Sequence, residues 1–161
     1  MVMFMDKERI HDKIRDEIRR WLESKNCVVH SRVQIEWPLS SLDRNDWYYL
    51  LKYGKLQKFR FPRSSILKSS VRPSLSRSVL MRQREYIVVD LLGYKERITN
   101  NFIIEISHSS NLTKEVEKLK GIYKIKTKVI VRTDGTERQV NGVRIIPYGK
   151  FKDWFEEYFS F

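Results

Sequence analysis

Cysteine is almost missing from this chain, because Cys27 is its single cysteine. A disulfide framework and a zinc site built from cysteines are therefore excluded. Apolar stretches are short as well, since none approaches the roughly 18 residues needed to cross a bilayer. Charged residues begin at Asp6 and Lys7, which does not fit a secretory leader. These absences predict an intracellular, cytoplasmic protein with no membrane partner.

The short motifs of two enzyme classes are also missing. There is no Walker-type glycine-rich loop, which argues against nucleotide hydrolysis by that route. There is no Gly-x-Ser-x-Gly motif, which argues against a serine hydrolase built on that elbow. Hydrophobic residues nevertheless make up 41% of the 161 residues and aromatic residues 12%. That content is enough for a packed core in a single domain spanning 1–161.

Acidic residues are missing from one long segment of the chain. Residues 47–84 contain ten lysines and arginines and no acid, in a protein of net charge +12. The rest of the chain is therefore nearly neutral, and the basic segment predicts a polyanionic partner, DNA first, with RNA not excluded. Seven of its residues are expected to bind nucleic acid: Arg60, Arg63, Lys68, Arg72, Arg77, Arg82 and Arg84.

Part of the basic segment, 62–78, is rich in serine and also holds Pro62 and Pro73. This composition predicts a flexible loop. Its charge favours an arm that neutralises backbone phosphates and becomes ordered on binding. A solvated surface loop of mixed use is the alternative interpretation.

Hydrophobic periodicity predicts the secondary structure. Apolar residues at helical spacing predict helices over 6–25, 109–124 and 149–159. Apolar or alternating runs predict strands over 27–35, 86–92, 102–106, 128–132 and 142–146, and 46–61 reads as a strand or a short helix. Strands this apolar indicate an α/β fold with a central sheet covered by helices. The aromatic face of the last helix is expected to pack in the core, with a homodimer interface as the alternative.

Two acidic residues interrupt apolar strands. Asp90 follows Ile87-Val88-Val89, and Glu105 lies inside the run 102–106. A carboxylate among such side chains is unfavourable to bury unless it is paired or binds a cation. If the two strands pair antiparallel, a register exists that brings the acids together, and Mg²⁺ or Mn²⁺ would remove their repulsion. Alternatively, Asp90 caps a strand end and Glu105 pairs with an arginine of the basic segment.

The order of these features resembles the PD-(D/E)XK nuclease superfamily, which includes restriction endonucleases and archaeal Holliday junction resolvases. The resemblance rests on the first helix, Asp90, the Glu105-Ile106-Ser107 run, the helix that follows and the strand 128–132. It covers residues 8–35 and 86–132, with the basic segment as an insertion. It implies a restriction-endonuclease-like fold, a mixed four-stranded sheet with flanking helices. It also implies that Asp90 and Glu105 bind Mg²⁺ for phosphodiester hydrolysis.

The chain departs from the family pattern at two positions. Val89 precedes Asp90 where the family has proline, and Ser107 stands where the family has a catalytic lysine. A serine cannot supply the positive charge that stabilises the transition state. In this superfamily the lysine can move to the following helix, where Lys114, Lys118 and Lys120 are candidates. A helical projection at about 100° per residue favours Lys120 and turns the other two away.

Other candidate residues surround this proposed centre. The family often has an acidic residue on the first helix that faces the site, for which Asp12, Asp16 and Glu17 are open alternatives. His108 follows Ser107 and is expected to cap a helix or contact phosphate, with proton transfer as its less favoured role. The sequence as a whole predicts a metal-dependent nuclease acting on DNA. A non-catalytic nucleic-acid-binding protein that keeps the fold is the alternative, because of Ser107.

Overall fold

The computed structural model describes residues 2–37, 42–55, 85–108, 111–122 and 124–159. The segment 62–78 lies outside the described residues, as do all seven basic residues expected to bind nucleic acid. Within the described part, no helix combines the length and the apolar character needed to cross a membrane.

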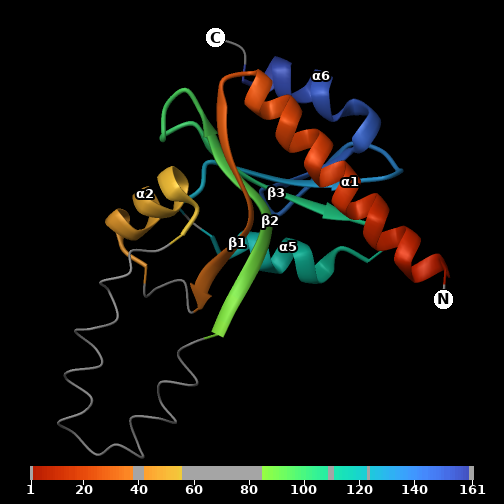
Figure 1. Cartoon of the computed structure of the whole chain (residues 1–161), viewed down its shortest axis with the longest axis horizontal. Helices are drawn as coiled ribbons and strands as arrows, with labels where there is room; N and C mark the ends of the chain where they lie inside the picture. Colours follow the sequence, from red (N-terminus) through yellow and green to blue (C-terminus); the bar gives the residue numbers. More distant parts are fainter. Residues whose placement is uncertain (1, 38–41, 56–84, 109–110, 123, 160–161) are drawn as a thin grey trace, which may run out of the picture.

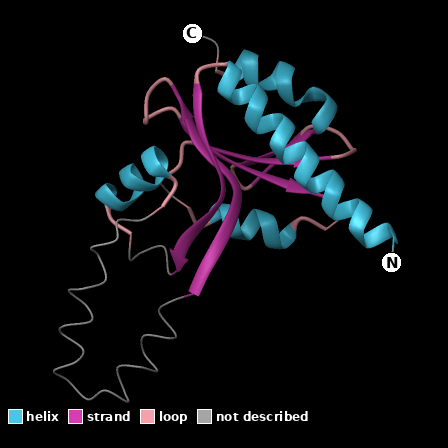
Figure 2. Cartoon of the chain, in the orientation of Figure 1, coloured by secondary structure: helices cyan, strands magenta, loops and turns pink. Residues whose placement is uncertain are grey.

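The described chain forms an α/β fold around one mixed sheet (Figures 1 and 2). Its strands are β1 (Cys27–Trp37), β2 (Glu85–Lys95), β3 (Asn101–Ser107), β4 (Thr127–Arg132), β5 (Arg138–Val140) and β6 (Val143–Pro147). Their order in the sheet is β1-β2-β3-β4-β6-β5. The pairs β1–β2, β2–β3 and β5–β6 are antiparallel, whereas β3–β4 and β4–β6 are parallel. The predicted α/β class with a central sheet is confirmed.

In the part of the chain that the structure describes, two pairs of helices cover the sheet. They are α1 (Val2–Ser24) and α6 (Tyr148–Tyr158) on one face, and α2 (Arg44–Tyr53) and α5 (Thr113–Lys120) on the other (Figure 1). On the α1 side, Ile18 and Phe155 are almost completely buried against Phe102 of β3. The Phe155 ring meets Phe102 edge to face at 5.6 Å. The expected core packing of the last helix is therefore confirmed.

The helix α2 resolves the ambiguity of 46–61 as far as the described residues reach. Asp43 accepts a hydrogen bond from the backbone N–H of Asp46, and Asp46 accepts one from Asp43 in return, which closes a capping box. Gly54 ends the helix at φ +77°, a left-handed conformation that glycine adopts without strain. Helix α5 is shorter than expected, since it begins at Thr113 and ends at Lys120. The short strand β5 is absent from the sequence prediction.

Strands β1 and β2 change the face that they bury halfway along their length. Val29 and Leu91 pack on the α1 side, whereas Val33 and Val89 pack on the α2 and α5 side. Residues two apart in a regular strand share a face, so both strands are irregular between these positions. In β1 the irregular residue is Arg32, whose φ of +51° is unusual for a side chain with a Cβ. This distortion sets the geometry of the site described next.

Candidate active site

Asp90 and Glu105 meet where the pairing of β2 with β3 ends. The register between the strands runs up to Leu91 opposite Ile104, which makes Asp90 and Glu105 the next residues outward. Their carboxyl groups are in hydrogen-bonding contact. The Ile106 N–H donates to Asp90 Oδ2 at 2.9 Å, so this carboxylate takes the place of a strand carbonyl. The structure thus brings together the two acids that the antiparallel register was expected to join.

Glu105 lies on the α5 side of the sheet. Its side chain is 8% exposed, and its Oε1 lies 2.6 Å from Lys118 Nζ. Lys118 also donates a hydrogen bond to the carbonyl of Val88 at 2.6 Å, which fixes the ammonium between the two strands. Burial first, and the neighbouring Asp90 second, raise the pKa of Glu105 to about 8, although Lys118 opposes the shift. Glu105 is therefore paired with a lysine of α5, and within the described residues no arginine takes that place.

Asp90 lies on the α1 side, where its partner is a histidine. His11 Nε2 lies 3.4 Å from Asp90 Oδ2 and 3.0 Å from the carbonyl oxygen of Ile106. Because a carbonyl can only accept, Nε2 carries a hydrogen and donates it. Burial raises the pKa of Asp90, but hydrogen bonds from His11, Glu105 and the Ile106 N–H outweigh it and bring that pKa to about 2. The hydrogen bond to Asp90 in turn raises the pKa of His11 above its usual value, against the effect of burial.

The two carboxyl groups therefore share one proton at neutral pH. Asp90 holds the negative charge, and Glu105 keeps a proton that it directs at its neighbour. A divalent cation between them would replace that proton and attract both oxygens. Glu105 Oε1 is buried and, apart from its contact with Lys118 Nζ, has no hydrogen bond of normal geometry.

The donor set fits Mg²⁺ or Mn²⁺ better than a softer metal, because its ligand atoms are carboxylate oxygens. No group of three or more His, Cys, Asp or Glu residues in the described ranges could hold a metal by itself. A cation here would complete its shell with water and main-chain oxygen, as Mg²⁺ commonly does. The residues present fit such an ion as an open site with two carboxylates.

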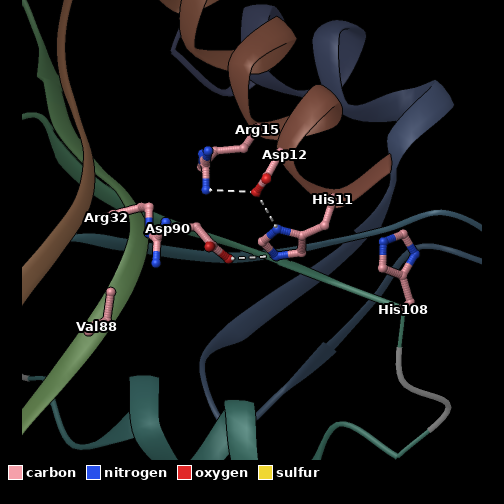
Figure 3. Close-up of a pocket in the computed structure, with 7 residues that line it drawn as sticks. All are labelled: His11, Asp12, Arg15, Arg32, Val88, Asp90 and His108. Atoms are coloured by element: carbon pink, nitrogen blue, oxygen red, sulfur yellow. Dashed lines mark ion pairs between the residues drawn. The ribbon is translucent and has the colours of Figure 1, made fainter. Parts of the chain in front are cut away.

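A pocket of about 550 Å³ opens beside Asp90 on the α1 side (Figure 3). Its lining residues are His11, Asp12, Arg15, Arg32, Val88, Asp90 and His108. Figure 3 shows Arg15 and Asp12 of α1 above, and His11 of α1 level with Asp90 and Arg32, which come from neighbouring strands. His108 stands at the far side, with its ring centroid 6.1 Å from that of His11. Solvent and a ligand can therefore reach Asp90 from the side of α1.

The structure corrects the sequence preference among the three helix lysines. Lys118, which the helical projection turned away, contacts Glu105, whereas Lys120 and Lys114 are exposed. The apolar face was assigned correctly, since Val116 and Leu119 are buried, but the projection ignored the reach of a lysine side chain. Lys118 lies beside that face and still brings its ammonium to Glu105 and to the Val88 carbonyl. Ser107 is buried at the end of β3, opposite Arg132 of β4 in the register.

Of the three acids considered on the first helix, Asp12 lines the pocket beside Asp90, with its Oδ1 3.7 Å from His11 Nδ1. Asp12 Oδ1 lies 3.2 Å from Arg15 Nη1, and Asp16 Oδ1 lies 3.6 Å from Arg15 Nε. Glu17 accepts a hydrogen bond from the hydroxyl of Tyr148, which ties α1 to α6.

Sequence reasoning missed His11, the residue of α1 that contacts Asp90. A signal was present, because His11, Ile14 and Ile18 follow the three-and-four spacing of the helix face that packs on the sheet. A histidine in line with buried isoleucines lies toward the sheet rather than toward solvent. In the structure it is half-buried and directed at β2.

Comparisons of the chain with protein-family models, with curated proteins and with solved structures found no match.

Proposed function

We propose that this protein is a metal-dependent nuclease that hydrolyses phosphodiester bonds of DNA. One observation carries the proposal: two carboxylates from adjacent strands meet at the point where the strands separate, and a lysine ammonium contacts one of them at 2.6 Å. Paired carboxylates that share a proton are a natural place for Mg²⁺ or Mn²⁺. A lysine beside them supplies the positive charge that Ser107 cannot.

The arrangement of elements supports a restriction-endonuclease-like core. The chain passes through α1, the antiparallel strands β1, β2 and β3, the crossover helix α5 and then β4, parallel to β3. This is the order of the sequence features that resemble the PD-(D/E)XK superfamily. The additional strands β5 and β6 extend the sheet beyond the four of that core.

Each residue of the proposed centre has a separate task. Asp90 and Glu105 would hold the metal ion, which, when bound, supplies an activated water and neutralises charge on the scissile phosphate. Lys118 places its ammonium beside Glu105, where it would offset the negative charge that develops on the phosphoryl oxygens. His11 holds Asp90 in one orientation by donating toward both Asp90 and the Ile106 carbonyl.

A second candidate function is nucleic-acid binding without catalysis. Ser107 favours it, because the lysine that the family carries at this position is absent. In that case the contact between Lys118 and Glu105 would be a structural ion pair that neutralises a buried acid.

A cleavage assay separates the two functions. The full-length protein is incubated with linear duplex and single-stranded DNA in Mg²⁺ or Mn²⁺, and Asp90→Asn and Glu105→Gln are run beside it. We expect cleavage by the wild type and a loss of about 10³-fold or more in each variant, because each removes a metal ligand. Cleavage that survives both substitutions would refute the metal centre. Salt-sensitive DNA binding without cleavage in either metal would favour the second function.

The basic segment supplies the proposed contact with DNA. Replacing Arg72, Arg77 and Arg82 together by glutamine should weaken DNA binding. It should also lower the slope of log affinity against log salt by up to about 3, one unit for each lost phosphate contact. Fluorescence anisotropy over a salt series measures that slope. A slope equal to that of the wild type would show that other residues bind the phosphates.

A further inference from the structure

Among the described residues that line the pocket, Arg32 is the one arginine that comes from the sheet. It lines the pocket together with Asp90, and both residues lie between the pairs Ser31–Leu91 and Val33–Val89 of the β1–β2 register. Ser31 accepts a hydrogen bond from Arg19 of α1 at 2.8 Å, so consecutive residues of β1 both lie toward α1. Regular alternation would direct Arg32 to the opposite face.

The backbone at Arg32 is strained in order to place this side chain. Its φ of +51° lies in the left-handed region, which costs a residue with a Cβ on the order of 1 kcal/mol. Glycine would adopt this conformation more easily, yet the position holds a long cationic side chain. Backbone strain of this kind clusters at active sites and ligand-binding positions, where it holds a side chain in the required place.

Among the described residues, none supplies a counterion to Arg32. Arg15 is held by Asp12 at 3.2 Å, and His11 is held by Asp90 at 3.4 Å. Arg32 is exposed and forms neither an ion pair nor a hydrogen bond with any described residue. As far as the described residues show, the guanidinium of Arg32 is available to bind a negative charge. It lies beside Asp90, the carboxylate that would hold the proposed metal.

Arg15 adds a second positive charge at the same pocket, while Asp12 contacts its Nη1. Its side chain is 12% exposed, and its Nε is buried without a hydrogen bond, 3.6 Å from Asp16 Oδ1. A planar guanidinium suits a phosphate because it can donate two parallel hydrogen bonds.

We propose that this pocket binds the phosphodiester next to the one that is cut, with Arg32 as its principal contact and Arg15 behind it. The inference rests on the proposed nuclease function and specifies its substrate: a polynucleotide strand held through at least two phosphates. A free nucleotide would not fill both positions. Asp90 lies between the two positions, with Glu105 and Lys118 on one side and the pocket on the other.

Binding without cleavage tests the pocket separately from the chemistry. A fluorescein-labelled oligonucleotide, single-stranded or duplex, is titrated with full-length protein in EDTA over a salt series. The variants are Arg32→Gln and Arg32→Lys. Arg97→Gln is the matched control, because Arg97 is exposed in the turn before β3 and the substitution removes the same charge. Circular dichroism verifies that each variant is folded.

We expect Arg32→Gln to weaken binding about 10-fold and to reduce the salt slope by about one. Arg32→Lys should fall between it and the wild type, because the charge stays and the two-pronged contact is lost. Arg97→Gln should bind within about twofold of the wild type. Equal affinities for Arg32→Gln and Arg97→Gln would overturn the pocket assignment.

The same variants separate this inference from the proposed function. If the wild type cuts DNA and Arg32→Gln binds and cuts normally, the nuclease stands and the phosphate pocket fails. If nothing is cut, yet Arg32→Gln binds weakly and Arg97→Gln binds normally, the pocket stands and the nuclease fails. Competition by a mononucleotide as strong as that by the oligonucleotide, per molecule, would contradict the requirement for two phosphates.

Discussion

The two sides of the sheet give their carboxylic acids opposite acid strengths. On the α1 side, Asp90 meets a histidine and a backbone N–H, and its pKa falls to about 2. On the α5 side, Glu105 is more deeply buried beside that negative charge, and its pKa rises to about 8. The difference shows that an adjacent pair can hold one permanent charge and one exchangeable proton.

The positive partners of the two acids differ as well. His11 donates to Asp90 and to a main-chain carbonyl, which makes it a positioning residue. Lys118 bridges Glu105 and the Val88 carbonyl, so its ammonium lies at the opening between β2 and β3.

The largest expected effect on DNA cleavage comes from replacing Lys118, the positive partner on the α5 side of the sheet. Lys118→Met should reduce DNA cleavage by about 10²- to 10³-fold, because it removes the charge that would stabilise the transition state. Lys120→Met is the matched control on the same helix and should retain activity within about threefold. Single-turnover cleavage with saturating enzyme measures the step itself. A greater loss in Lys120→Met would assign the stabilising charge to Lys120, the lysine that the helical projection favoured. Equal losses in both variants would contradict a specific role for Lys118.

Glu105→Gln should remove a pH dependence of stability. The pKa of Glu105 is raised from an ordinary 4.5 to about 8, so its stabilising contribution is complete below 4.5 and is lost as pH rises toward 8. His11 acts in the same direction, because its pKa is raised above 6.5. Asp90 acts in the opposite direction, but only below pH 4, where its stabilising contribution is lost as pH falls.

Urea unfolding at pH 5.5 and pH 8.5 measures this effect. We expect the wild type to lose about 1 to 3 kcal/mol between the two values, and Glu105→Gln to lose clearly less. Asp90→Asn serves as the comparison. It removes the charge that, after burial, raises the pKa of Glu105, so it should also flatten the dependence of stability on pH. A wild-type stability that rises between pH 5.5 and 8.5 would contradict the shared proton.

Added Mg²⁺ should stabilise the wild type by about 1 to 2 kcal/mol at concentrations well above its dissociation constant. The effect should be larger at pH 8.5 than at pH 5.5, because the ion competes with the proton on Glu105. Asp90→Asn and Glu105→Gln should each abolish it. Thermal unfolding with and without the ion measures the shift, and an equal shift in both variants would place the ion elsewhere.

The sequence predicts the parts of this site that depend on local pattern. Apolar runs identify β2 and β3, and an acid within each run identifies Asp90 and Glu105 as residues that need a partner. The antiparallel pairing that brings the two acids together was only a condition in the sequence, and the structure meets it. These inferences need only the hydrophobic period and the unfavourable free energy of burying a charge.

Tertiary contacts determine the rest. The choice of Lys118 depends on the path of its long side chain, which reaches Glu105 and the Val88 carbonyl from beside the buried face of α5. Arg32 reaches the pocket because its own backbone is left-handed inside a strand. The alternation of polar and apolar residues does not predict such a conformation. His11 reaches Asp90 only because α1 crosses the sheet at that level.

The smallest expected effect concerns the strained strand itself. Arg32→Gly should be more stable than Arg32→Ala by about 0.5 to 1 kcal/mol, because alanine retains the unfavourable Cβ at a φ of +51° and glycine does not. Both variants lack the guanidinium, so their DNA affinities should fall equally while their stabilities differ. Urea midpoints give the first comparison and anisotropy titrations the second. If Arg32→Gly is no more stable than Arg32→Ala, the backbone at Arg32 is not strained. The strand would then not distort at an energetic cost in order to present this side chain.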